Sequence, residues 1–263
     1  MWEALQFDFM RQAVVASVLV SILCGIMGSY VVVNRISFIS GGIAHAAYGG
    51  VGASIFFGIP IMLGTGLFAL AVGVLIAILS FRHKERVDTI IGVIWALGMA
   101  VGVILLDKSP GFKGDILSYL FGNILLVNKT DTYALLAIDV VAIILISVFY
   151  KEFMAISFDR EFAMVIGIPT LRLYILLICL ISISIVTIIK IVGILLVVAL
   201  LTIPPLIAEK FVKSLGKMMV LSSFFIMFFS ILGLQISYKF NLPAGACIII
   251  VASLSFLITR FLK

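Results

Sequence analysis

The chain has 263 residues, of which 64% are hydrophobic and only 11% are charged. About 25% of the residues in an ordinary soluble domain are charged, so this composition excludes one. The formal net charge of +6 could suggest nucleic-acid binding, but the bases form short clusters between apolar runs, as in cytoplasmic loops of membrane proteins. We therefore expect a single transmembrane domain over residues 1–263, embedded in a lipid bilayer and binding no nucleic acid.

A helix needs about 20 apolar residues to cross the roughly 30 Å hydrocarbon core of a bilayer. Nine runs have this character: Ala13–Val33, Phe38–Phe57, Ile61–Phe81, Thr89–Leu106, Thr132–Tyr150, Leu171–Ile189, Ile191–Ala208, Met218–Tyr238 and Leu242–Phe261. They predict an all-α polytopic membrane protein with eight or nine transmembrane helices. Asp115–Val127 is too short to cross, so we expect a partial or external helix there. Pro204 and Pro205 could break the run that contains them.

Lysine and arginine are distributed unequally between the two predicted sides of the membrane. Twelve of the eighteen lie on one side: Arg35, those in 82–86, those in 151–172, those in 210–217, and those at the C terminus. Cytoplasmic loops carry an excess of these residues, so this side is expected to face the cytoplasm. Its longest loop contains Ser157–Pro169.

Glycines are frequent in the first two predicted spans: Gly25, Gly28, Gly41, Gly42, Gly49, Gly50 and Gly52. Small residues let membrane helices approach one another closely. Tight helix packing is therefore the simpler interpretation. The alternative is that Gly41 and Gly42 break the second helix at a point where a transport pathway opens.

The sequence contains no motif for nucleotide binding or catalysis. Gly216-Lys217 is followed by Met218, and Phe211 stands where a phosphate-binding loop needs its first glycine. The serine-hydrolase and zinc-protease motifs are also absent. We expect this chain to be no enzyme and to bind no cofactor, so that any ATP hydrolysis takes place on another polypeptide.

His45 and Asp139 are the histidine and the carboxylate that fall inside predicted spans, where ionisable groups are costly and often functional. Neutral imidazole is a good ligand for first-row transition metals, so His45 is a candidate ligand in a metal pathway. The alternative is a hydrogen-bonded histidine that only packs. Asp139 is a weaker candidate, because it lies near the outer end of its span and could be hydrated there. His83, in a basic cluster, is expected to be solvated.

The segment Ser157–Pro169 combines charged residues with a short apolar face. Carboxylates favour a helix start, and glycine followed by proline favours a stop. The charged start comprises Asp159, Arg160 and Glu161, the apolar face Phe162, Ala163, Val165 and Ile166, and the stop Gly167 and Pro169. A short helix lying on the cytoplasmic surface could dock a nucleotide-binding subunit or anchor at the interface. The residues themselves leave both alternatives open.

Four segments, in their order along the chain, resemble the membrane permeases of bacterial ABC transporters that take up zinc, manganese or iron. They are Cys24–Phe38, Ala44–Gly52, Asp159–Pro169 and Val192–Pro205. Asp88–Gly92 and Ser237–Gly245 agree with the same family. These permeases are related in fold to those of vitamin B12 and siderophore importers.

The resemblance implies one half of an importer in the bacterial cytoplasmic membrane. Two copies would pair with two cytoplasmic ATP-binding subunits, and an extracytoplasmic metal-binding protein would deliver the ion, with zinc or manganese expected. The segment Ser157–Pro169 matches the family's coupling helix, which docks on the ATPase. Many members carry an aspartate four residues before the motif histidine, whereas this chain has Gly41 before His45.

Two other classes of protein compete with this interpretation. A self-sufficient secondary transporter or cation channel usually shows inverted repeats and broken helices with buried charges, of which the sequence offers only the glycine pattern and Asp139. An integral-membrane enzyme or assembly factor would need convergent polar groups, which the sequence does not provide.

Overall fold

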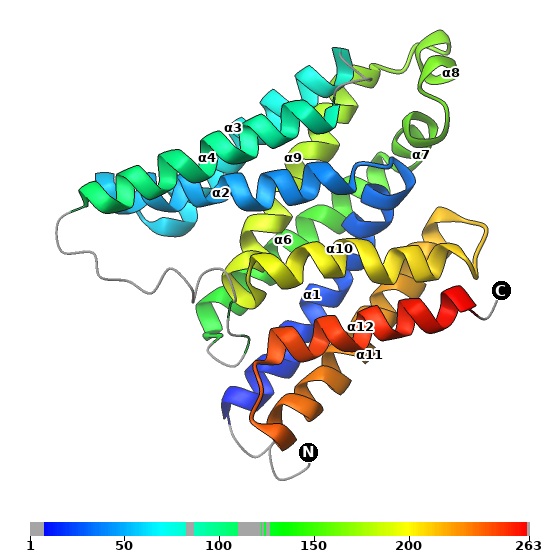
Figure 1. Ribbon diagram of the computed structural model, residues 1–263. Helices are drawn as coiled ribbons and strands as arrows, with labels where there is room; N and C mark the ends of the chain where they lie inside the picture. The colour runs from blue at the N-terminus through cyan, green and yellow to red at the C-terminus, as the bar shows by residue number, and fades with distance from the viewer. Residues whose placement is uncertain (1–7, 83–86, 110–121, 123, 125–126, 262–263) are drawn as a thin grey trace. The chain divides into compact units, whose positions relative to one another are not determined.

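The computed structural model describes residues 8–82, 87–109, 122, 124 and 127–261, and the regular elements in these ranges are helices (Figure 1). The long helices are α1 (Asp8–Val33), α2 (Ser37–Phe57), α3 (Ile61–Arg82), α4 (Val87–Lys108), α6 (Lys129–Val148), α9 (Thr170–Val192), α10 (Ile194–Glu209), α11 (Leu215–Phe240) and α12 (Ala244–Phe261). Two short helices, α7 (Tyr150–Phe158) and α8 (Arg160–Val165), lie between α6 and α9. The all-helical prediction is confirmed for these ranges.

Each of the nine predicted spans corresponds to one long helix. Seven helices of the described residues are long and apolar enough to cross a membrane: α1, α3, α4, α6, α9, α11 and α12. Helix α10 has only 16 residues, and α2 includes His45 and many glycines and serines, which lower its mean hydropathy. A count of eight or nine transmembrane helices is therefore not established by length and composition. The predicted partial helix at Asp115–Val127 lies almost wholly outside the described residues, and so does His83.

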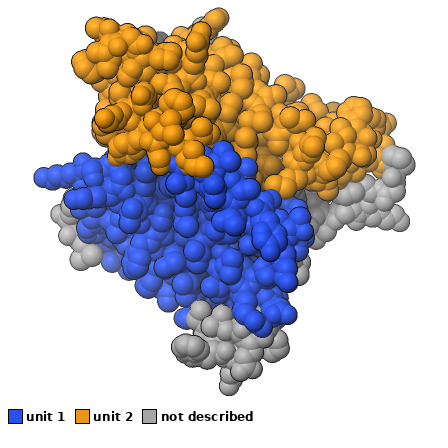
Figure 2. Space-filling view, turned by 180° about the vertical axis from the view of Figure 1, so that it is seen from behind, with its two compact units in different colours: residues 1–35, 116–143, 188–263 blue, residues 36–115, 144–187 orange. Residues whose placement is uncertain are grey.

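The chain forms two compact units, coloured separately in Figure 2, each assembled from distant parts of the sequence. Unit 1 comprises residues 1–35, 116–143 and 188–263, and unit 2 comprises residues 36–115 and 144–187. Helix α6 begins in unit 1 and ends in unit 2, and α9 begins in unit 2 and ends in unit 1.

Unit 1 is built on close contacts of α1 with α10 and α11. A Cβ atom at Gly25 would lie 2.7 Å from the backbone nitrogen of Ser223, and one at Gly28 would lie 2.7 Å from the carbonyl oxygen of Leu201. Helices α11 and α12 meet at Gly233, where a Cβ would lie 2.7 Å from the Cα of Ile248. These glycines are therefore required for backbone-to-backbone packing.

Unit 2 holds α2 against both α3 and α4. A Cβ atom at Gly98 of α4 would lie 2.8 Å from the Cα of Ala46, and one at Gly50 of α2 would lie 2.7 Å from the Cα of Thr65 in α3. Tight packing, the simpler interpretation of the glycines in the first two predicted spans, is confirmed for all of them except Gly41, where an added Cβ would meet no atom within 4 Å. Helix α2 runs without a break through Gly41 and Gly42, so the alternative of a broken helix there is wrong.

The break near the proline pair lies elsewhere than expected. Helix α10 continues through Pro204 and Pro205, although each removes a backbone donor from the helix. The chain is instead interrupted at Gly193, between α9 and α10, where φ is +85° and glycine avoids the strain of a side chain.

Large apolar side chains remain exposed along several helices, as a bilayer requires. On α4, Val93, Leu97 and Ile104 are 64%, 63% and 59% exposed. Soluble proteins rarely expose apolar surface on this scale, so lipid is the environment that covers it. This finding and the seven apolar helices agree with a multi-pass membrane protein.

The glycine contacts of unit 2 predict a difference between two alanine variants on the same helix. Gly98→Ala places a methyl group against the backbone of α2, whereas a Cβ at Gly92 meets no atom within 4 Å. We expect Gly98→Ala to lower the free energy of unfolding by about 1–3 kcal/mol relative to Gly92→Ala, measured by denaturant unfolding of the purified protein in detergent. Equal stability of the two variants would contradict the close approach of α2 and α4.

Candidate ion-pathway residues and docking helix

His45 lies on α2 with its imidazole stacked on the indole of Trp95 from α4. The ring centroids are 4.2 Å apart and the planes differ by 12°. The Nδ1 atom of His45 is buried and has no hydrogen-bond partner among the described residues. The alternative of a packing histidine predicted a hydrogen bond, which is missing at this nitrogen, although the ring does pack. A buried nitrogen with no partner is a position where a metal ion could bind.

The indole also has a fixed position, because its Nε1 donates a hydrogen bond to the Sδ of Met99 at 3.0 Å. Trp95 was not among the residues expected in the site. It lies fifty positions from His45, and no spacing in the sequence links the two. The one available signal is the presence of a tryptophan inside an apolar span.

Gly41 lies one helical turn before His45 and leaves open space beside it. A Cβ atom built at Gly41 meets nothing within 4 Å, whereas one at Gly42 would collide with the side chain of Ile91. Residues four apart lie on the same helix face, so a longer side chain at position 41 could extend beside the imidazole. The face of α2 that carries His45 is thus open at the position where related permeases are expected to have an acid.

Asp139 on α6 belongs to unit 1, whereas His45 belongs to unit 2. Its side chain is buried, with 2% exposure, and neither carboxylate oxygen has a hydrogen-bond partner among the described residues. The expectation that Asp139 could be hydrated near the end of its span is therefore wrong. In the part of the chain that the structure describes, no group of three or more His, Cys, Asp or Glu residues could hold a metal ion.

Helix α8 begins and ends where the sequence predicted. The Oδ1 atom of Asp159 accepts a hydrogen bond from the backbone N–H of Phe162 at 2.9 Å, which caps the helix. The helix ends before Gly167, whose φ of +85° turns the chain toward Pro169 and α9. The helix presents Glu161, Phe162 and other residues to the outside, and Ala163 is its buried side chain.

The apolar face of α8 is exposed rather than packed. Phe162 is 56% exposed and Val165 is 85% exposed, with Met164 and Ile166 exposed as well. Arg160 points differently: its guanidinium lies over the rings of Phe81 and Tyr174. Sequence reasoning grouped Arg160 with its exposed neighbours and missed both aromatic residues, because they come from α3 and α9.

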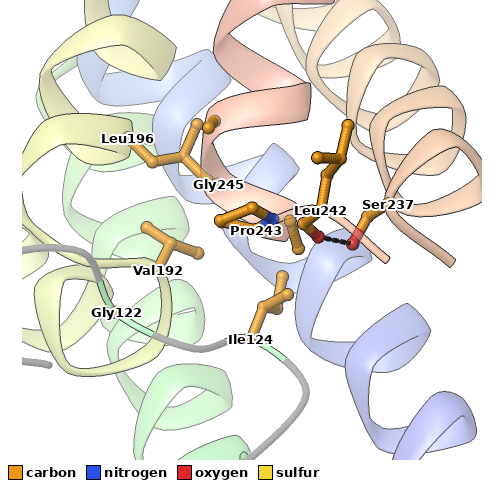
Figure 3. Close-up of a pocket in the computed structure, with 10 residues that line it drawn as sticks. Gly122, Ile124, Val192, Leu196, Ser237, Leu242, Pro243 and Gly245 are labelled. Atoms are coloured by element: carbon orange, nitrogen blue, oxygen red, sulfur yellow. Dashed lines mark hydrogen bonds between the residues drawn. The ribbon is translucent and has the colours of Figure 1, made fainter. Parts of the chain in front are cut away.

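A cavity of about 200 Å³ lies in unit 1, where α9 meets α10 and α11 meets α12 (Figure 3). Apart from the hydroxyl of Ser237, the side chains that line it are apolar: Gly122, Ile124, Val192, Leu196, Ser237, Leu242, Pro243, Ala244, Gly245 and Ala246. The Oγ of Ser237 donates a hydrogen bond to the carbonyl oxygen of Leu242 at 2.6 Å, which closes the turn between the last two helices. Because none of the lining side chains is charged, this cavity does not have the donors of a metal site.

The chain resembles known membrane proteins over nearly its whole length. Residues 6–263 match the ABC 3 transport family. An uncharacterised membrane protein of Synechocystis sp. is 44% identical, covering 98% of this chain and 92% of that protein. The manganese transport system membrane protein MntC of Listeria monocytogenes is 34% identical, covering 97% of this chain and 90% of that protein.

Solved structures agree with these relatives. PsaBC from Streptococcus pneumoniae, in complex with Fab, matches with a TM-score of 0.87 and 32% identity, covering 98% of this chain and 93% of the other. A protein described as a metal-chelate type ABC transporter, in an inward-facing conformation, matches with a TM-score of 0.77. Its identity is 16%, so this second likeness concerns the fold alone.

The family match covers far more than half of the chain, and curated relatives above 30% identity align along almost all of it. These findings confirm the resemblance predicted from the four segments, together with a multi-pass membrane subunit of a metal importer. The chain belongs to the ABC 3 transport family.

Proposed function

We propose that this chain forms one half of the ion pathway of an ATP-driven manganese importer. The observation that carries this proposal is the alignment of manganese transport permeases with almost the entire chain. A second copy of the chain would complete the pathway, and an extracytoplasmic protein would deliver Mn²⁺ to it. ATP would be hydrolysed on two cytoplasmic subunits, so the chain itself is not an enzyme.

In this proposal α2 and α10 cross the membrane together with the seven apolar helices. Helix α2 has 21 residues, about 32 Å at 1.5 Å per residue, which is the length of the hydrocarbon core. It packs against both α3 and α4, which bury four of its glycines, while Gly41 and His45 are half-buried. Helix α10 has 16 residues but continues from α9 through Gly193, and it packs on α1, α11 and α12.

His45 is the proposed ligand of the transported ion in unit 2. Its stack on Trp95 fixes the ring plane, and its unpartnered Nδ1 offers a position for a cation. With Gly41 one turn before it, α2 supplies a single strong donor on this face. Few ligands give weak binding, which suits an ion in transit because it must leave the site again.

Asp139 is a second proposed ligand, in unit 1. Burial of a carboxylate without a hydrogen-bond partner is costly, and a bound cation or proton would relieve that cost. Mn²⁺ favours carboxylate oxygens, so the chemistry of this group fits the proposed substrate.

Helix α8 is the proposed docking site for the cytoplasmic ATPase. Its exposed apolar side chains and exposed Glu161 form a surface that a groove on the ATPase could cover. The alternative of an interfacial anchor requires that the apolar face turn toward lipid. That face is interrupted by the buried Ala163 and flanked by the charges of Asp159 and Glu161.

The proposal is tested in lipid vesicles that contain the chain, its ATPase and its binding protein. ATP should drive accumulation of radioactive manganese, and zinc and iron serve as competing ions. No ATP-dependent uptake of any of the three metals would refute the proposal. Uptake by the purified chain alone, driven by an ion gradient, would instead favour the secondary transporter.

Two variants of His45 distinguish a metal ligand from a packing residue. His45→Ala removes both the nitrogen and the stack, whereas His45→Phe keeps a ring against Trp95 and removes the nitrogen. We expect both to lower manganese uptake by about 10–100-fold at normal expression, the scale on which weakened ligation acts. Normal uptake by His45→Phe would assign the ring to packing only.

The open position at Gly41 predicts a gain of metal affinity. Gly41→Asp places a carboxylate one turn before His45 in space that is free of other atoms. We expect it to tighten Mn²⁺ binding to the purified chain by about tenfold or more, because two donors then face the same ion. Gly41→Asn is the matched control, with the same shape and no charge. Equal affinities for the two variants would show that position 41 does not face the ion.

Charge reversal at Glu161 tests the docking surface. Glu161→Lys should reduce co-purification of the ATPase by about tenfold, which corresponds to about 1.4 kcal/mol, while membrane insertion stays normal. Glu209→Lys makes the same change at the exposed end of α10, in unit 1, and serves as the control. If Glu161→Lys left co-purification of the ATPase unchanged, Glu161 would not be part of the interface with the ATPase.

A further inference from the structure

Helix α8 has only six residues; the single residue Asp159 separates it from α7, and the chain that follows it is not helical. Asp159 before it is extended, with φ of −146° and ψ of 95°, and Gly167 after it has a positive φ. An isolated helix of this length is unstable in water, so contacts with the rest of unit 2 determine its position. A movement of α8 can therefore reach other helices only through the contacts that α8 makes with them.

Arg160, the first residue of α8, makes such a contact with two other helices. Its guanidinium carbon lies 4.7 Å from the ring centroid of Phe81 at the end of α3 and 4.6 Å from that of Tyr174 near the start of α9. Both distances fall within the range of a cation–π interaction. The two rings are 6.1 Å apart and tilted by 47°, so the guanidinium is held by both. One side chain thus joins α8 to α3 and α9.

Tyr174 of α9 is also joined to α3 by a hydrogen bond. Tyr174 is 3% exposed, and its hydroxyl shares a hydrogen bond with the Oγ of Ser80 at 3.3 Å. Ser80 is also buried and bonds to the carbonyl oxygen of Ala77 at 3.2 Å. The rings of Phe81 at the end of α3 and Tyr174 near the start of α9 thus form a binding site, here called the seat, for the guanidinium.

Among the described residues, no carboxylate lies within ion-pair distance of Arg160. The positive charge of Arg160 is thus stabilised by the faces of the Phe81 and Tyr174 rings. A planar guanidinium can stack on a ring, whereas the compact, strongly hydrated ammonium of lysine cannot do so equally well. The seat is therefore specific for arginine rather than for positive charge.

We propose that Arg160 is a positioning residue that transmits movement of the docked ATPase from α8 to α3 and α9. This inference rests on the proposed docking of the ATPase on α8. Glu161 and Phe162 face outward toward the partner, while Arg160 faces the permease. Helix α3 packs in turn on α2, where a Cβ at Gly50 would meet the backbone of Thr65. A path of direct contacts thus leads within unit 2 from the docking helix to the helix that carries His45.

The experiment uses the full complex of chain, ATPase and binding protein in lipid vesicles. It measures ATPase co-purification, the rate of ATP hydrolysis, and the manganese taken up per ATP. Arg160→Gln removes the charge and Tyr174→Leu removes one ring, whereas Tyr174→Phe keeps the ring and removes only the hydroxyl that bonds to Ser80. We expect Arg160→Gln and Tyr174→Leu to keep co-purification within about twofold and to lower uptake per ATP by about tenfold, with a smaller loss for Tyr174→Phe. Arg160→Lys should resemble Arg160→Gln.

A double variant separates coupling from simple loss of stability. If Arg160 and Tyr174 act as one unit, Arg160→Gln combined with Tyr174→Leu lowers uptake per ATP no further than either change alone. Loss of co-purification with Arg160→Gln, as strong as with Glu161→Lys, would make Arg160 an ATPase contact and overturn the inference. Normal uptake per ATP in Arg160→Gln would also overturn it.

Failure of the proposed function has a different signature, because the unmodified complex would then show no ATP-dependent uptake at all. If Arg160→Gln does not yield folded protein, Phe81→Leu tests the other ring of the same seat. Normal uptake per ATP in Phe81→Leu, together with normal uptake in Tyr174→Leu, would refute the role of the seat.

Discussion

A backbone in hydrocarbon must satisfy its own hydrogen bonds, and this constraint shapes every described part of the protein. Only helices meet it within a single segment, so the apolar runs form helices. Several hydroxyl side chains follow the same rule: Ser17, Ser29 and Ser182 each donate to the carbonyl oxygen four residues before them. Once backbone and hydroxyl groups are satisfied within each helix, the helices attract one another mainly by close packing, and glycine becomes the residue that sets their distance.

Burial of an ionisable group without a hydrogen-bond partner in such a structure costs free energy. His45 and Asp139 are such groups, since neither the Nδ1 of the one nor the carboxylate of the other has a hydrogen-bond partner among the described residues. Charges that are exposed or paired do not carry this cost. An example is the ion pair between Lys190, near the end of α9, and Asp131, at the start of α6. In the proposed function, this cost is the physical reason why each group, taken by itself, is assigned as a ligand of the transported cation.

The helices of this fold could be predicted from the sequence, but the contacts between them could not. Apolar length predicts each long helix, and Asp159 with Gly167 predicts the limits of α8, because these signals are local. The stack of His45 on Trp95 and the contact of Arg160 with Phe81 join residues fifty or more positions apart, and no local pattern encodes them. The prediction that Asp139 could be hydrated was wrong for a related reason. It was based on the position of Asp139 along one span, whereas the burial of its side chain depends on neighbouring helices in the fold.

The orientation of two adjacent residues on α8 gives the short helix its proposed role. Consecutive residues of a helix point about 100° apart, so neighbours can face different surfaces, as Arg160 and Glu161 do. One lies between two aromatic rings, and the other is exposed. An element that couples two proteins needs a contact on each side, because a partner can shift an equilibrium only through interactions that differ between the two states. Helix α8 is separated from α7 by one extended residue, and the side chain of Arg160 provides a direct contact from α8 to the end of α3 and the start of α9.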